Sequence, residues 1–299
     1  MKEYTLRKSF TAAIQTFALH PLHLYSKLWG SILLTSVALC FAIYTCVNCI
    51  VIPASALPLT NNFGYIHNVI YTTLHLEALS WFKIALSMLI FLIFNSIMHS
   101  AFLHYEIPGK TDFVKTQNVS LLNHIKVLTP QALKHFILSV IRLLLIALCI
   151  IGIFYSIINT NWWTICASGI LLIVFDFTTY HANYIWKQSP TLSLHRRYKA
   201  IYSSYRPHIG QLTVFSLIYR PIILCMLLLL FLPTIVTTID YFFDNVAIFA
   251  GENSGLPTYF AYIYVIIMWV SCCLITWIKM LFLLPTRFLL PQINNRPCL

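Results

Sequence analysis

Charged residues are scarce in this chain of 299 residues. Asp, Glu, Lys and Arg together make up 9% of it, whereas a soluble globular domain carries about 25%. Hydrophobic residues make up 59%, and the mean hydropathy is +0.79. This composition leaves too little polar surface for a domain that folds in water, so it excludes that class.

Lys and Arg are missing altogether from alternate gaps between six long apolar stretches. A membrane-spanning helix needs about 20 mostly apolar residues, and each stretch is long enough to be one. The predicted spans are residues 29–53, 80–103, 134–157, 162–186, 211–238 and 258–283. The sequence therefore predicts an all-α, polytopic transmembrane helical bundle that forms one integral membrane domain over residues 1–299.

The distribution of charge predicts an orientation. Sixteen of the 19 basic residues lie towards one side of the predicted spans. The charged residues in the opposite gaps are all acidic, namely Glu77, Asp240, Asp244 and Glu252. Because Lys and Arg concentrate in cytoplasmic segments, we expect both termini inside, in a bacterial inner membrane. The net charge of +11 suits anionic lipids on the cytoplasmic face. We expect no nucleic-acid partner, since that needs a soluble basic domain.

Each basic segment also carries apolar residues at helical spacing, which predicts amphipathic helices in the cytoplasmic membrane interface. These helices are predicted at residues 4–19, 119–128 and 194–205. A proline follows each of them and is expected to break the helix there. The three prolines are Pro21, Pro130 and Pro207.

An interfacial helix, a proline break and a transmembrane hairpin thus occur three times. One interpretation is a set of three repeated units, at residues 1–103, 115–187 and 191–283. Repeated hairpins are common in transporters. The alternative is three unrelated hairpins, since hydrophobic segments resemble one another easily.

Four charged residues lie in or at the margin of the predicted spans: Lys83 is near the outer end of one, and Arg142, Asp176 and Arg220 lie deeper. At 1.5 Å per residue the last three lie about 12–16 Å from the cytoplasmic side, so their depths match. An isolated charge at such a depth costs at least about 2.5–3.5 kcal/mol. We therefore expect Asp176 to pair with Arg142, with Arg220, or with both.

Two interpretations of this charge cluster stay open. In the functional interpretation the cluster binds an anion or relays protons. In the structural interpretation it is an ion pair that fixes how the helices pack. The excess of one arginine favours an anion. Tyr180, His181 and Tyr184 could extend a polar path towards the cytoplasm, and Pro221 is a candidate kink beside Arg220.

Motifs for catalysis and metal binding were sought and not found: the chain has no HExxH, no GxSxG and no Walker A loop. Asp240, Asp244 and Glu252 could hold a divalent cation, but an acidic outer rim is the favoured interpretation. For Cys46 and Cys49 we favour packing or an incidental disulfide over a redox or metal site. We expect no catalytic residue, no metal and no cofactor.

The favoured function is non-enzymatic binding or transport of a small anionic solute or lipid through the charge cluster. A membrane subunit or scaffold of a protein complex is one alternative, with a homo-oligomer or a complex partner left open. A lipid-modifying membrane enzyme is another. Its interfacial candidates are His195, Arg196, Arg197, Arg206 and His208.

The predicted ion pair can be tested by a double-mutant cycle on Asp176→Ala and Arg142→Ala. Residues that pair should couple, so the loss in the double variant should be smaller than the sum of the two single losses. The measurement is the free energy of unfolding of the purified protein. Additive losses would show that the two residues are not paired.

Overall fold

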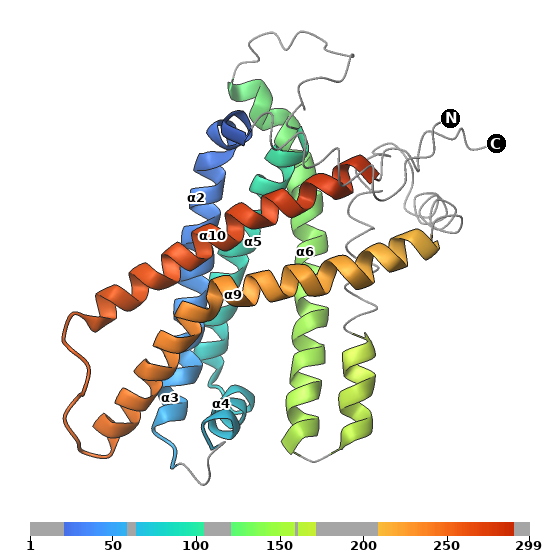
Figure 1. Ribbon diagram of the computed structural model, residues 1–299. Helices are drawn as coiled ribbons and strands as arrows, with labels where there is room; N and C mark the ends of the chain where they lie inside the picture. Colours follow the sequence, from blue (N-terminus) through green and yellow to red (C-terminus); the bar gives the residue numbers. More distant parts are fainter. Residues whose placement is uncertain (1–20, 59–63, 105–120, 159–160, 172–208, 290–299) are drawn as a thin grey trace.

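The computed structural model describes residues 21–58, 64–104, 121–158, 161–171 and 209–289, and these residues form helices and no strand (Figure 1). The elements are α2 (Pro21–Cys46), the π-helix η1 (Val47–Val51), α3 (Ile52–Ser55), α4 (Gly64–Leu74), α5 (Ala78–His104), α6 (Leu121–Ile158), the helical segment Trp162–Leu171, α9 (Ile209–Phe249) and α10 (Phe260–Leu289).

Five stretches of these helices are long and apolar enough to cross a membrane, which confirms the predicted transmembrane bundle. They are Leu28–Ser55, Ala78–His99, Ser139–Ile157, Cys225–Phe249 and Phe260–Lys279. The fourth span predicted from the sequence, 162–186, is described only as far as Leu171. The count of six spans therefore stays a prediction.

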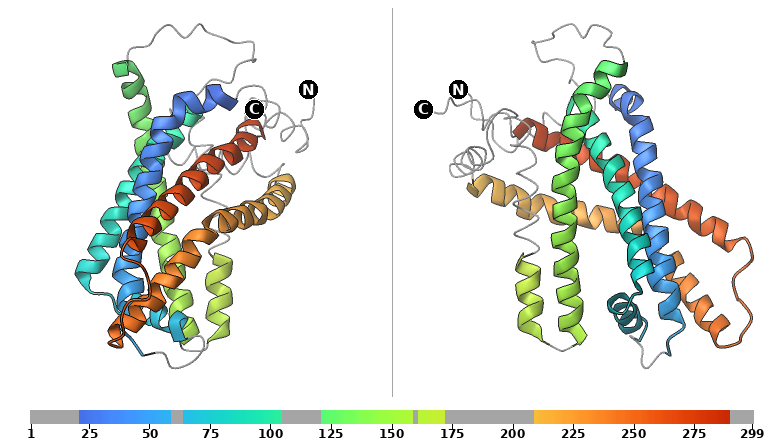
Figure 2. Two further views of the ribbon diagram at one scale, coloured as in Figure 1. Left: turned by 60° about the vertical axis from the view of Figure 1, so that its left-hand side comes forward. Right: turned by 180° about the vertical axis from the view of Figure 1, so that it is seen from behind.

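Successive spans run in opposite directions, so the bundle has two distinct ends. Figures 1 and 2 show α4 gathered at one end with the C-terminal ends of α6 and α9. We call this the acidic end, because the adjoining segments hold Glu77, Asp244 and Glu252. We call the opposite end, where α5 ends and α6 begins, the basic end. Which end faces the cytoplasm stays a prediction.

The helix of the first span passes through a π-helical turn near the acidic end. Pro53 lacks a backbone N–H and cannot donate to the carbonyl of Cys49, four residues earlier. One turn widens there, and the N–H of Ile52 donates to the carbonyl of Val47, five residues earlier. The Cys46 and Cys49 thiols at this turn are free, and Cys49 is buried. This favours packing over a disulfide for the two cysteines.

The predicted break at Pro130 is wrong. Helix α6 begins at Leu121 and continues through Pro130, so residues 121–128 form its first turns instead of a separate helix. A proline removes one hydrogen bond and kinks a helix, but a membrane helix can continue where neighbouring groups satisfy the freed carbonyl. Figure 1 shows the first turns of α6 at an angle to the rest. The predicted helices 4–19 and 194–205 lie outside the described residues.

The predicted end of the fifth span at residue 238 is too early, because α9 continues to Phe249. The helix ends in a Schellman motif, in which the N–H of Glu252 donates to the carbonyl of Ala247 and the N–H of Gly251 to that of Ile248. Gly251 has a φ of 85°, which glycine adopts without strain. Gly251 was therefore the stop signal in the sequence.

Helix α9 has 41 residues and would measure about 60 Å if straight, twice the thickness of a bilayer core. Figure 1 shows that it changes direction near its middle. Both Pro221 and Pro233 lie within α9, and a kink at Pro221 stays a prediction. Thr237 and Thr238 donate to carbonyls of residues 233 and 234, within the same helix.

The described core lies where α2, α9 and α10 meet. Its buried members are Cys40, Val47, Tyr264, Met268 and Cys272. The hydroxyls of Tyr264 and Thr238 are 3.0 Å apart, and since Thr238 already donates to the carbonyl of Thr234, Tyr264 is the donor. This hydrogen bond ties α10 to α9 inside the apolar region.

Replacing Tyr264 by Phe should lower the free energy of unfolding by about 0.5–1.5 kcal/mol, because the bond to Thr238 is lost. The matched control is Tyr262→Phe: Tyr262 is 75% exposed and Tyr264 only 1%. Reversible unfolding in mixed micelles would measure both variants. Equal losses in the two variants would mean that the Tyr264–Thr238 bond contributes nothing.

Candidate functional site

The structure describes one of the three predicted site residues in full. Arg142 lies on α6 and is half-buried. Arg220 lies in α9, but its side chain is not among those described, and Asp176 lies outside the described residues. The predicted pairing of Asp176 therefore stays a prediction. The polar path of Tyr180, His181 and Tyr184 also lies outside the described residues.

Arg142 belongs to the face of α6 that is turned away from lipid. The exposed apolar residues Ile137, Ile141, Leu144 and Leu148 recur at three- and four-residue spacing, so they share one face. At about 100° per residue, Arg142 falls about 130° around the helix from the centre of that face. Charged residues within a membrane almost always face the interior of the bundle, as Arg142 does.

A second cation, Lys279 of α10, lies in the neighbourhood of Arg142. The Nζ of Lys279 donates a 2.7 Å hydrogen bond to Oδ1 of Asn95, a buried residue of α5. The Arg142 guanidinium lies near enough to Lys279 for the two charges to repel each other. We call Arg142, Lys279 and Asn95 the cationic cluster. Three helices, α5, α6 and α10, contribute one residue each.

Hydroxyl and imidazole groups lie on α5 and α6 within about one helical turn of the cationic cluster. Ser96 is buried next to Asn95, and His99 lies one helical turn further along α5. Ser139 precedes Arg142 by one turn of α6. These groups can all donate hydrogen bonds, so this part of the bundle combines positive charge with donors and suits an anion.

The acids of the described residues lie elsewhere. Glu77, Asp240, Asp244 and Glu252 are the only ones within the described ranges, and all lie towards the acidic end. An anion in the cationic cluster must therefore come from a segment outside these ranges, as predicted for Asp176, or from a bound ligand. Either would offset the repulsion between Arg142 and Lys279.

Asp244, one of the residues considered for a divalent cation, positions the loop between α9 and α10. Its Oδ2 accepts from the hydroxyl of Ser254 at 2.8 Å, and its Oδ1 accepts from the N–H groups of Gly255 and Leu256 at 2.8 and 3.2 Å. The carboxylate is thus engaged by the chain itself. This supports the structural interpretation, and within the described ranges no three His, Cys, Asp or Glu side chains are grouped for a metal.

Sequence reasoning overlooked Lys279 and Asn95. Lys279 lies at the end of the last apolar run, where it resembles the basic residues of the C-terminal segment. Asn95 is one of many polar residues in the spans. The feature that could have pointed to Asn95 is its depth in the bundle, which matches that of Arg142. Asn95 lies 17 residues from the start of α5, and Arg142 lies 16 residues from the end of α6. Both positions are therefore about 25 Å from the acidic end.

Replacing Asn95 by Ala should lower the free energy of unfolding by about 1–3 kcal/mol, because the Lys279 ammonium loses its buried acceptor. The control is Asn245→Ala, since Asn245 bonds only to the carbonyl of Tyr241 in its own helix. Denaturant unfolding of both variants in the same micelles provides the comparison. A loss at residue 95 no larger than at residue 245 would contradict this role of Asn95.

Comparison with known proteins assigns no function to the site. The chain matches no family model, no curated protein and no solved structure. What is established is an integral membrane protein built as a helical bundle, in which the buried amide of Asn95 holds Lys279 and the charge of Arg142 lies near that of Lys279.

Proposed function

We propose that this membrane protein binds a small anionic solute or lipid, as a non-enzymatic binding or transport protein, through the cationic cluster. The observation that carries the proposal is Lys279, hydrogen-bonded to Asn95, with the charge of Arg142 close enough to repel it. Two like charges in a medium of low dielectric constant repel strongly, and an anion between them turns this repulsion into attraction. The site is thus more stable when it is occupied.

The balance of charge along the chain supports an anion from outside. Arg142, Arg220 and Lys279 all fall within the predicted spans towards the basic side, against the single acid Asp176. If Asp176 neutralises one cation, a surplus remains for a guest. Arg and Lys are also the side chains that bind carboxylate and phosphate groups, Arg through two parallel hydrogen bonds.

The same proposal places the cationic cluster on the cytoplasmic side. The basic end adjoins the segments that carry most of the Lys and Arg residues, and such segments face the cytoplasm. A bacterial inner membrane with both termini inside, and anionic lipids as partners on that face, complete the proposal.

The test is whether anions stabilise the protein through these two residues. The purified full chain in neutral detergent would be titrated with inorganic phosphate, citrate or phosphatidylglycerol while its melting temperature is followed. A ligand present at 100 times its dissociation constant should stabilise the wild type by about 2.7 kcal/mol. The variants Arg142→Gln and Lys279→Gln should lose this response.

The control variant is Lys83→Gln, because Lys83 is exposed on α5 towards the acidic end. It removes the same charge without touching the cationic cluster, and it should respond to anions as the wild type does. The proposal fails if none of the three anions stabilises the wild type. It fails equally if Lys83→Gln loses the response as fully as Lys279→Gln.

A further inference from the structure

We infer that the anion is the phosphate group of a membrane phospholipid, held between α5, α6 and α10 at the headgroup level of the leaflet on the basic side. This inference rests on the proposed function and narrows its ligand. The argument uses the depth of the cationic cluster, the tryptophans that mark the membrane boundaries, and the chemistry of its two cations.

The depth of the cationic cluster matches the lipid headgroups. Asn95 lies about 25 Å along α5 from its first residue, Ala78, and Arg142 lies about 24 Å along α6 from Ile158. The hydrocarbon core of a bilayer is about 30 Å thick. A helix that enters this core at the acidic end thus brings both residues to within a few ångströms of its opposite boundary, next to the lipid phosphates, so Arg142 is shallower than the depth of about 12 Å that its spacing from Lys134 predicts.

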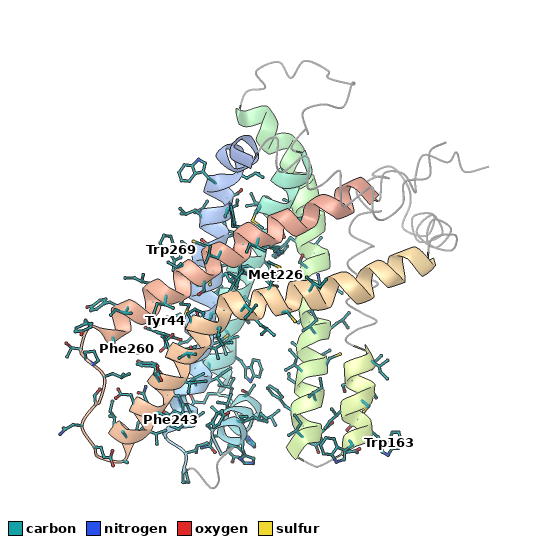
Figure 3. All side chains as sticks on the ribbon, in the orientation of Figure 1. Tyr44, Trp163, Met226, Phe243, Phe260 and Trp269 are labelled. Atoms are coloured by element: carbon teal, nitrogen blue, oxygen red, sulfur yellow. The ribbon has the colours of Figure 1, made fainter. Side chains whose placement is uncertain are left out.

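Five exposed tryptophans lie near the same two boundaries, while Trp269, 37% exposed, lies midway along the span of α10. Trp81, Trp162 and Trp163 are exposed at the acidic end, and Figure 3 shows Trp163 projecting outward there. Trp29, near the start of the first span, and Trp277, two residues before Lys279, are exposed towards the basic end. Tryptophan concentrates at membrane interfaces. The cationic cluster therefore lies level with a boundary rather than at the centre of the bilayer.

The two cations differ in a way that suits a phosphate. The planar guanidinium of Arg142 can donate two parallel hydrogen bonds to two phosphate oxygens, and the ammonium of Lys279 acts as a point charge on a flexible stem. Asn95 fixes that ammonium by accepting one of its protons at 2.7 Å. The remaining protons of Lys279 stay available to a ligand.

A phosphate bound here would connect two helices, α6 and α10, that pack mainly against other helices. Helix α10 packs mainly on α2 and α9, whereas α6 packs on α5. One phosphate between Lys279 and Arg142 would link α10 to α6 directly. Binding would then stabilise the whole bundle and not only the side chains that contact the lipid.

The experiment is native mass spectrometry of the full chain in neutral detergent, offered three probes. Phosphatidylglycerol carries the phosphate and two acyl chains, diacylglycerol carries the same chains without phosphate, and glycerol 3-phosphate carries phosphate without chains. The proteins are the wild type, Lys279→Gln, Lys279→Arg, which keeps the charge, and Lys83→Gln as the control.

We expect the wild type, Lys279→Arg and Lys83→Gln to retain phosphatidylglycerol, and Lys279→Gln to bind it at least about tenfold more weakly, a difference of one buried ionic contact. Diacylglycerol and glycerol 3-phosphate should bind more weakly than phosphatidylglycerol to every protein. Lys279→Arg is also a control for folding. It keeps the positive charge in a side chain of similar length, so binding by this variant would show that a substitution at residue 279 does not by itself abolish binding.

Each other outcome overturns a distinct claim. If glycerol 3-phosphate binds the wild type as tightly as phosphatidylglycerol and depends on Lys279, the lipid is excluded while the proposed anion site stands. If diacylglycerol binds as tightly as phosphatidylglycerol, the phosphate is not recognised and the inference is wrong. If no phosphate probe binds and other anions also fail to stabilise the protein, both this inference and the proposed function are wrong.

Discussion

The absence of water in the bilayer core is the constraint on which this structure depends. A polar group without a partner in hydrocarbon costs several kcal/mol, so the backbone must form helices and polar side chains must find partners within the protein. Thr35 and Ser36, both buried on α2, donate to carbonyls of their own helix. Tyr264 reaches across to Thr238 for the same reason. Loops, whose backbone cannot satisfy itself, lie at the ends.

The same constraint gives the cationic cluster its significance. A hydroxyl can donate to a carbonyl one turn away, but Arg142 and Lys279 carry full charges that no local carbonyl neutralises. Both are placed at the boundary level, and Lys279 is held by a buried amide from another helix. Two neighbouring cations gain most from a shared anion, and the proposal of a binding site rests on this.

Much of the fold could be predicted because the relevant signals are local. Long apolar runs identify the spans, and the predicted spans 29–53 and 80–103 agree with the described helices to within a few residues. The errors came where one local signal competed with another. Pro130 was interpreted as a break although a membrane helix can continue through it, and Gly251 marks the end of α9 more reliably than the acids before it do.

The sequence by itself determined the membrane class, the alternation of charge between the two ends and the presence of Arg142 within a span. These follow from composition and from spacing along one helix. Only the tertiary structure decided that Lys279 meets Asn95, 184 residues away in the chain, beside Arg142. The reason is physical: helical periodicity tells which face of a helix avoids lipid, but which helices then become neighbours depends on how the side chains of all of them pack together.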